Sequence, residues 1–101
     1  QALEYAKRAH ELRPNNPQVQ STYGRLLVAE SRGHRQGLAL LEAAMAKAPD
    51  DPEIRYNLAA ALALTGDPDR AREEMEKLLA MKQDVIDTRE LSYVMNELVM
   101  E

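Results

Sequence analysis

Apolar residues recur along this chain of 101 residues at the three- and four-residue spacing that places them on one face of a helix. Two such stripes alternate, and each returns about 35 residues later. They predict pairs of antiparallel helices whose apolar faces meet. The first stripe holds Tyr23, Leu26, Leu27, Leu58, Ala61 and Leu62, and the second holds Leu38, Leu41, Ala44, Met45, Ala71, Met75, Leu78 and Leu79.

Capping residues predict where the helices begin. Asn16-Pro17, Asp51-Pro52 and Asp67-Pro68 each place an N-cap acceptor before a proline at the first helical position, where the missing N–H has no helical partner. Asp87-Thr88-Arg89-Glu90 has the form of a capping box that opens a final helix. The predicted helices cover residues 2–13, 17–31, 35–48, 52–65, 68–82 and 87–99.

Glycine and proline predict where the helices end. Gly33 and Gly66 are expected in the left-handed conformation just past a helix, and Pro14 and Pro49 cannot continue one. Gly24 has another role, because Ala59 takes its place one repeat later and a flexible site would not accept alanine. We interpret it as a packing glycine.

Small residues recur where two helices of a pair would come closest. Gly24 and Ala59 occupy this position on the first helices, and Gly37 and Ala71 occupy it on the second helices. Helices with small residues at their contact can pack closely.

Charge and hydropathy exclude several classes of function. Residues 1–35 hold six Lys or Arg and three Glu, whereas residues 36–101 hold seven Lys or Arg and fourteen Asp or Glu. The net charge of −4 argues against nucleic acid, whose phosphates require a clustered basic face. No run of about 18 apolar residues is present for direct membrane insertion. The chain has no cysteine, so its composition fits a reducing or an oxidising compartment equally well.

Residues that could support catalysis or bind a metal are scattered. His10 and His34 have no second ligand at helical spacing on the same face, and Ser21, Ser31 and Ser92 have no histidine and acid placed to form a triad. We therefore expect no enzyme activity, no metal site and no cofactor. A helical repeat of about 35 residues is typical of solenoids, which present a surface to a protein partner.

The repeat resembles the tetratricopeptide repeat (TPR), a helix-turn-helix unit with characteristic positions on each helix. Tyr23-Gly24 and Leu58-Ala59 fit the first helix. Gly37, Leu41, Ala44 and Pro49 fit the second helix, as do Ala71, Met75 and Leu78 one repeat later. The resemblance implies an all-α solenoid of about six helices in one domain, with residues 1–14 as the second helix of a truncated repeat, 17–49 and 52–82 as repeats and 87–100 as a capping helix.

The chain also departs from the TPR pattern. The positions of large aromatic residues hold Gln20, Leu41 and Met75, and the turn at residues 31–34 is one residue longer than its counterpart. Residues 38–67 are similar to bacterial TPR lipoproteins associated with exopolysaccharide and exosortase-type surface systems. That similarity would imply that the protein lies in the periplasm or cell envelope. Without it, the sequence does not indicate a location, and the cytoplasm is the alternative.

The TPR resemblance implies that the first helices line a concave surface that binds a peptide or protein segment. Arg25 offers paired donors to a carboxylate or carbonyl, Asn57 suits a peptide backbone, and Tyr56 offers a flat apolar face. Alternatively, Asn57 bridges helices within the repeat and Arg25 is a solvated surface charge. The expected contact residues are Gln18, Ser21, Thr22, Arg25, Glu53, Tyr56, Asn57 and Ala60, with Val28, Ala29 and Ala63 facing the same groove.

The chain begins with a second helix that has no first-helix partner, so we expect a piece of a longer solenoid. Its Leu3, Ala6, Ala9 and Tyr5 side would then lack its cover, and this open face is expected to self-associate. The alternative function is a structural spacer in which the repeats stack on their neighbours and the groove binds nothing.

Overall fold

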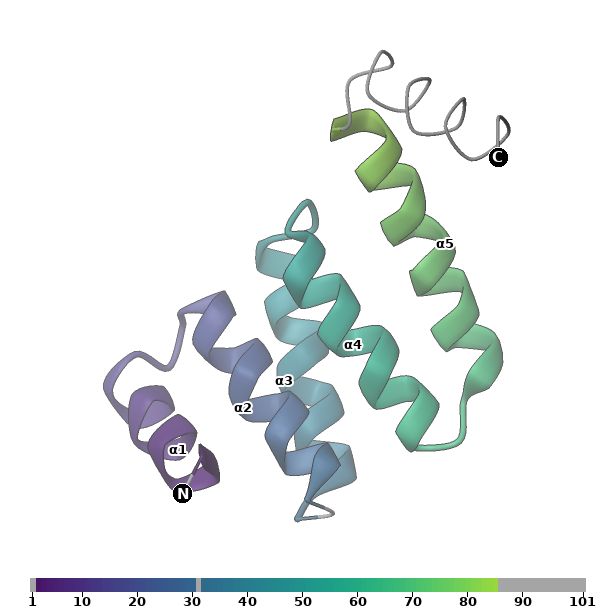
Figure 1. Ribbon diagram of the computed structural model, residues 1–101. Coiled ribbons are helices and arrows are strands. Elements are labelled where there is room, and N and C mark those ends of the chain that lie inside the picture. The colour runs from purple at the N-terminus through teal and green to yellow at the C-terminus, as the bar shows by residue number, and fades with distance from the viewer. Residues whose placement is uncertain (1, 31, 86–101) are drawn as a thin grey trace, which may run out of the picture.

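Helices account for the whole architecture of the residues that the structure describes, which are 2–30 and 32–85 of a computed structural model (Figure 1). This confirms the predicted all-α, TPR-like fold. The predicted last helix, over residues 87–99, and the capping role of residues 87–100 lie outside the described residues. The helices are α1 (Ala2–Leu12), α2 (Pro17–Ala29), α3 (His34–Lys47), α4 (Pro52–Leu64) and α5 (Pro68–Val85).

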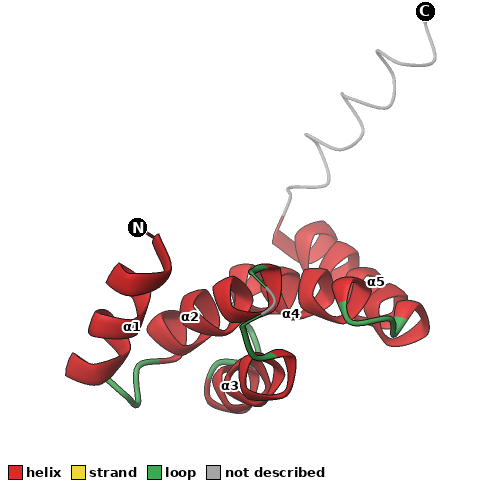
Figure 2. Ribbon diagram, turned by 90° about the horizontal axis from the view of Figure 1, so that it is seen from below, coloured by secondary structure: helices red, strands yellow, loops and turns green. Residues whose placement is uncertain are grey.

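The helices stack in chain order, with α2 and α3 forming one pair and α4 and α5 the next. Figure 2 shows α2 and α4 side by side with α3 beneath them, while α1 and α5 flank this group. The contacts agree, because α4 packs against both α2 and α3 and α1 packs against α2. The described part is elongated, with extents of 50 × 28 × 26 Å. One side of α2 and α4 therefore faces away from α3.

The predicted N-caps are confirmed. The Asn16 side chain accepts a hydrogen bond from the Val19 N–H at 3.1 Å, and the Asp51 side chain accepts from the Glu53 N–H at 2.9 Å. Asp67 accepts in the same way at the start of α5. The helix starts match the prediction to within one residue, and α5 runs on to Val85, past the predicted end at residue 82.

The two glycines predicted to end helices behave differently. Gly66 is left-handed, with φ of 85°, and the next N–H closes the turn on the Leu62 carbonyl at 2.9 Å. The same prediction for Gly33 is wrong, since its φ of 160° is extended and it is the N-cap of α3. The reason is that the Arg32 N–H already closes the turn on the Leu27 carbonyl, one residue earlier.

The apolar stripes form two buried clusters, one between the helix pairs and one between α1 and α2. The larger cluster joins α2, α3, α4 and α5, so it holds the two repeats together. Its members are Val28, Leu41, Leu58, Ala61, Leu62 and Ala71, with Leu38 and Met45 packed against them, and the smaller cluster holds Ala6, Tyr23 and Leu27, with Leu3, Leu26 and Leu40.

The apolar side of α1 is covered by α2, which corrects the prediction of an open face. Ala6 is buried against Tyr23 and Leu27, and Leu3 packs on the same cluster. The first helix that follows α1 supplies this cover, as α4 does for α3. Tyr5 is not part of this cluster and is 72% exposed.

A side-chain amide or guanidinium takes the place of a large aromatic residue near the start of each first helix. Gln20 on α2 donates to the Pro14 carbonyl at 3.0 Å, and Arg55 on α4 donates to the Pro49 carbonyl at 3.0 Å. These two donors lie one repeat apart, as do the two prolines. Each repeat therefore fastens the loop before its first helix by the same kind of hydrogen bond.

Arg55 also links α4 to α5 by a mostly buried ion pair. Its second terminal nitrogen donates to Glu74, and the two side chains are 13% and 9% exposed. A second pair, between Arg70 and Glu42, joins α5 to α3 at 3.0 Å but is about half exposed. The hydrogen bond to Glu42 raises the pKa of Arg70, so this residue stays charged and offers no pH switch.

The packing interpretation of Gly24 is confirmed by its surroundings in the contact between α2 and α3. A Cβ atom on Gly24 would lie 2.6 Å from the carbonyl oxygen of Gly37, and a Cβ atom on Gly37 would lie 2.6 Å from the carbonyl oxygen of Gly24. The two glycines thus allow each backbone to approach the other. In the next pair, the buried residues at these positions are Ala59 and Ala71.

The variant Gly24→Ala is expected to lose about 1–3 kcal/mol of unfolding free energy, because the new Cβ overpacks a backbone contact. Alanine's better helix propensity does not offset this loss, since a backbone carbonyl cannot turn aside like a side chain. Urea unfolding followed by circular dichroism measures it. Gln36→Ala is the control, because Gln36 is exposed on α3 and its change adds no atom to the contact between α2 and α3. Equal losses in the two variants would contradict the packing interpretation.

The variant Glu74→Ala is expected to lose about 1–3 kcal/mol of unfolding free energy, because it leaves the Arg55 charge mostly buried without its partner. Glu42→Ala removes the exposed pair and is expected to lose less than about 1 kcal/mol. Thermal unfolding of both variants measures the difference. A Glu42→Ala loss as large as that of Glu74→Ala would show that burial does not set the strength of these pairs.

Candidate protein-binding surface

Five of the eight predicted contact residues are exposed, and all five belong to α2 or α4, the two helices that lie side by side with α3 beneath them (Figure 2). We call the surface that these residues form the α2–α4 face. Ala60 lies beside them and is half-buried. Ala29 and Ala63, which were expected to face the same groove, are exposed. The five exposed contact residues are Gln18, Thr22 and Arg25 on α2, and Glu53 and Tyr56 on α4.

The structure does not place Ser21 and Asn57 on an open surface. Both are buried where α2 meets α4, and the Asn57 side-chain amide donates to the Ser21 hydroxyl at 2.8 Å. The side-chain oxygen of Asn57 accepts from Arg25 at 3.1 Å. Asn57 therefore bridges helices, as the alternative for this residue expected, but between two repeats and not within one. Val28 is also buried, as part of the core between the repeats.

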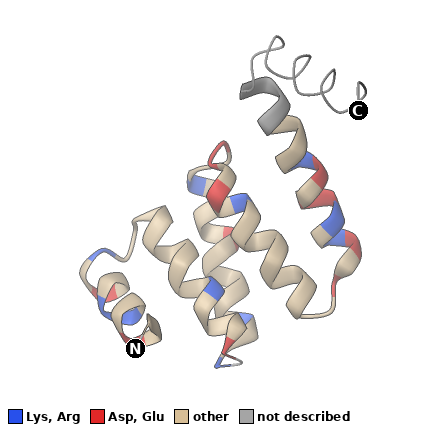
Figure 3. Ribbon diagram, in the orientation of Figure 1, with Lys and Arg blue, Asp and Glu red and all other residues tan. Residues whose placement is uncertain are grey.

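Arg25 is held in place at the middle of the α2–α4 face. Besides its bond to Asn57, its guanidinium carbon lies 5.7 Å from the ring centre of Tyr56, within the range of a cation–π contact. Arg25 is the one charged residue in α2, and Figure 3 shows it as a single basic site on that helix. The face thus presents a fixed cation surrounded by uncharged α2 side chains.

An apolar groove of about 320 Å³ lies between α4 and α5. We call it the α4–α5 groove. The second stripe predicts Met75 and Leu79 as core residues, but they are 37% and 56% exposed. Tyr56 and Ala60 belong both to this groove and to the predicted contact set. The groove is lined by Tyr56, Ala59, Ala60, Ala63, Pro68, Ala71, Arg72 and Met75.

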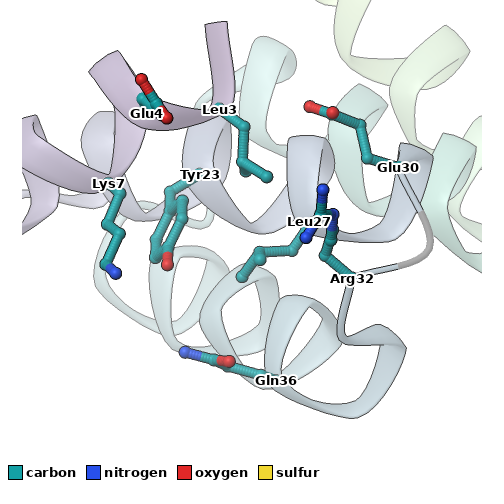
Figure 4. A pocket seen from close by; sticks show the side chains of 8 residues that line it. All are labelled: Leu3, Glu4, Lys7, Tyr23, Leu27, Glu30, Arg32 and Gln36. Carbon is teal, nitrogen blue, oxygen red and sulfur yellow. The ribbon is translucent and has the colours of Figure 1, made fainter. Parts of the chain in front are cut away.

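A second depression, of about 540 Å³, lies between α1 and the C-terminal half of α2 (Figure 4). Its apolar wall consists of Leu3, Tyr23 and Leu27, and none of its residues was predicted as a site. The charged lining has two acids and two bases, so it favours neither an anion nor a cation. No sequence signal marks it, because its charges resemble those of any solvated helix. They are Glu4, Lys7, Glu30 and Arg32, with Gln36 beside them.

The described residues include no group of three potential ligands that could hold a metal ion. His10 packs against Tyr23, with 5.2 Å between the centres of the two rings. No helix within residues 2–30 and 32–85 has the length and hydropathy needed to cross a bilayer.

The variant Asn57→Ala is expected to lose about 1–3 kcal/mol of unfolding free energy, because it leaves the buried Ser21 hydroxyl without its partner. Gln18→Ala changes an exposed residue on the same face and should shift stability by less than about 0.5 kcal/mol. Urea unfolding of the two variants checks this. If Asn57→Ala unfolds at the same urea concentration as Gln18→Ala, then the buried hydrogen bonds do not stabilise the contact between the repeats.

Comparisons with known proteins agree with this architecture. A comparison with curated proteins found no match. Residues 34–95 match the tetratricopeptide repeat family, and this segment begins with α3, includes α4 and α5 and covers more than half of the chain. The paired helices and the small residues at their contacts are consistent with that match. The chain therefore belongs to the tetratricopeptide-repeat family.

Proposed function

We propose that this chain is a non-catalytic scaffold or adaptor module that binds a peptide or protein segment on the α2–α4 face. Tetratricopeptide repeats generally mediate protein–protein interaction, and they form a non-enzymatic repeat domain. Solenoids of this kind use extended surfaces formed by successive repeats. The α2–α4 face is such a surface, since it spans two repeats.

The observation that carries the proposal is the fixed position of Arg25. A surface arginine normally loses side-chain entropy when it binds, but here Asn57 and Tyr56 already hold the guanidinium. Guanidinium has five N–H donors and the bond to Asn57 uses one. The remaining donors suit a carboxylate or a backbone carbonyl of a bound segment.

The other predicted contact residues divide into two roles. Gln18, Thr22 and Glu53 are exposed beside Arg25 and would contact the segment directly. Ser21 and Asn57 are buried and would act by positioning Arg25. Changes to the buried pair would therefore weaken both binding and folding. Changes to Arg25 would weaken binding directly, and they would also weaken folding through the lost hydrogen bond to the buried Asn57 oxygen.

The alternative function is a structural spacer within a longer solenoid. The contacts between the two repeats are compatible with it, because they form without a bound ligand. Self-association through α1 would now involve the exposed Tyr5 and Leu12, because Ala6 is covered by α2. The similarity to envelope lipoproteins remains a prediction from residues 38–67, and no comparison supports it.

A peptide selected from a phage-displayed random library on the intact chain provides the test. Arg25→Ala is expected to weaken its affinity about tenfold or more, because a hydrogen bond to a charged group contributes about 1.5–3 kcal/mol. Arg25→Lys should restore part of the loss by keeping the charge without paired donors. Fluorescence polarisation with the labelled peptide measures all three affinities.

Arg35→Ala is the matched control, since Arg35 is exposed on α3, away from the α2–α4 face. It should leave the affinity unchanged. Selected peptides that bind Arg25→Ala as well as the parent chain would argue against this face, and a library that yields no binding peptide would favour the spacer.

A further inference from the structure

The depression between α1 and α2, which we call the α1–α2 depression, corresponds to a surface one repeat later that an ion pair bridges. Positions in α1 and α2 correspond to those 35 residues on in α3 and α4, and positions in α3 to those 34 residues on in α5. At the later surface, Arg70 on α5 donates to Glu42 on α3 at 3.0 Å. The corresponding residues in the α1–α2 depression are Gln36 and Lys7. An amide and an ammonium group cannot form this ion pair, so the earlier surface is left without that bridge.

The apolar wall of the depression also has a counterpart one repeat later. Leu3 and Leu27 have leucines at the corresponding positions, and those leucines belong to the larger buried cluster or pack against it. Tyr23 differs, because the corresponding position holds a leucine without a polar group. Its hydroxyl points toward Gln36 in Figure 4. This side of the depression therefore has N–H and O–H donors, but it lacks the carboxylate that Glu42 supplies one repeat later.

The acids of the depression gather at one edge. In Figure 4 the carboxylates of Glu4 and Glu30 lie at the edge away from α3. The Lys7 ammonium group lies at the edge near α3, and the Arg32 guanidinium lies between the two edges. Arg32 belongs to the turn that is one residue longer than its counterpart. The depression thus presents acceptors at one edge and donors at the other.

This arrangement matches a neutral molecule that carries a positive and a negative group on an apolar body. The lining has two acids and two bases, so a zwitterion can place each of its charges beside an opposite charge. The volume of about 540 Å³ lies in the range of small-molecule sites, about 300–1,000 Å³. Glu4 and Lys7 are three residues apart, which is about 4.5 Å along the axis of α1. The two termini of a dipeptide are about 5–6 Å apart, so one dipeptide can reach both residues.

We propose that the α1–α2 depression binds a short apolar peptide in its zwitterionic form, with leucyl-leucine as the model ligand. The ammonium group of the peptide would lie beside Glu4 and Glu30. Its carboxylate would accept hydrogen bonds from Lys7 and Gln36, in the place that the Glu42 carboxylate has one repeat later. Its leucine side chains would pack on the apolar wall. The site shares no residue with the α2–α4 face, so either proposal can fail without the other.

A titration of the full ¹⁵N-labelled chain with leucyl-leucine, followed by amide chemical shifts, tests the site. We expect saturable shifts at the depression in α1, the C-terminal half of α2 and the start of α3. The expected Kd is about 1 mM, because ion pairs with exposed side chains are weak. Two matched ligands test the need for both charges, since N-acetyl-leucyl-leucine lacks the ammonium group and leucyl-leucinamide lacks the carboxylate. Each should bind about fivefold more weakly than leucyl-leucine.

Variants assign each charge of the ligand to an edge of the depression. Lys7→Gln should weaken leucyl-leucine several-fold and leave the affinity for leucyl-leucinamide unchanged, whereas Glu4→Gln should weaken leucyl-leucine and leave the N-acetyl compound unchanged. Arg8→Gln is the control, because Arg8 is exposed on α1 outside the depression and its loss should change neither affinity. Lys7→Glu with Gln36→Arg copies the ion pair of the next repeat into the depression, and this double variant should lose the binding of leucyl-leucine.

Three results would overturn the proposal. The first is the absence of a saturable shift with leucyl-leucine in the millimolar range. The second is equal binding of either matched ligand, because the depression would then take a simple carboxylate or a simple amine and not a zwitterion. The third is unchanged binding in the double variant, or shifts confined to the α2–α4 face, either of which would place the peptide outside the depression.

Discussion

Each helix pair in this protein has an apolar side that its own two helices cannot bury, and covering that side is the constraint on which the structure depends. Helix α4 covers the pair α2–α3, and its Leu58, Ala61 and Leu62 form one cluster with Val28 and Leu41. Neither repeat has a separate core, because the larger cluster takes residues from both. The free energy of unfolding of such a chain comes from the contacts between neighbouring repeats as well as from the contacts within each repeat.

The polar residues between α2 and α4 fix the position of one helix along the other. Apolar contacts alone would allow the two helices to slide, because such contacts are not directional. The Asn57 amide can bond to both the Ser21 hydroxyl and the Arg25 guanidinium only at one position of α4 along the axis of α2. A side chain that fixes the stacking therefore also fixes the cation on the exposed side. The same three residues connect folding with the proposed recognition.

The sequence predicts well whatever depends on residues close together in the chain. The N-caps at Asn16 and Asp51 are confirmed because a cap needs only an acceptor and N–H groups two or three residues away. Gly33 is mispredicted because the turn after α2 closes one residue before it, a difference set by the longer loop.

Burial between repeats could not be predicted in this way. The contact between Asn57 and Ser21 joins residues 36 positions apart, so it depends on which side of α2 meets α4. Met75 and Leu79 are exposed for a related reason, because a helical stripe shows that a face is apolar but does not show what covers it. The predicted contact residues all lie on α2 and α4, and two of them, Ser21 and Asn57, are buried.

The glycine contact between α2 and α3 has a consequence for the exchange of residues between the repeats. Because Gly24 and Gly37 lack Cβ atoms, the axes of that pair can lie closer together than those of α4 and α5, which meet through Ala59 and Ala71. The two pairs are thus joined through different contact residues. An exchange of the residues between them would not be neutral, because a Cβ atom at Gly24 or Gly37 would meet a backbone carbonyl oxygen at 2.6 Å and force α2 and α3 apart.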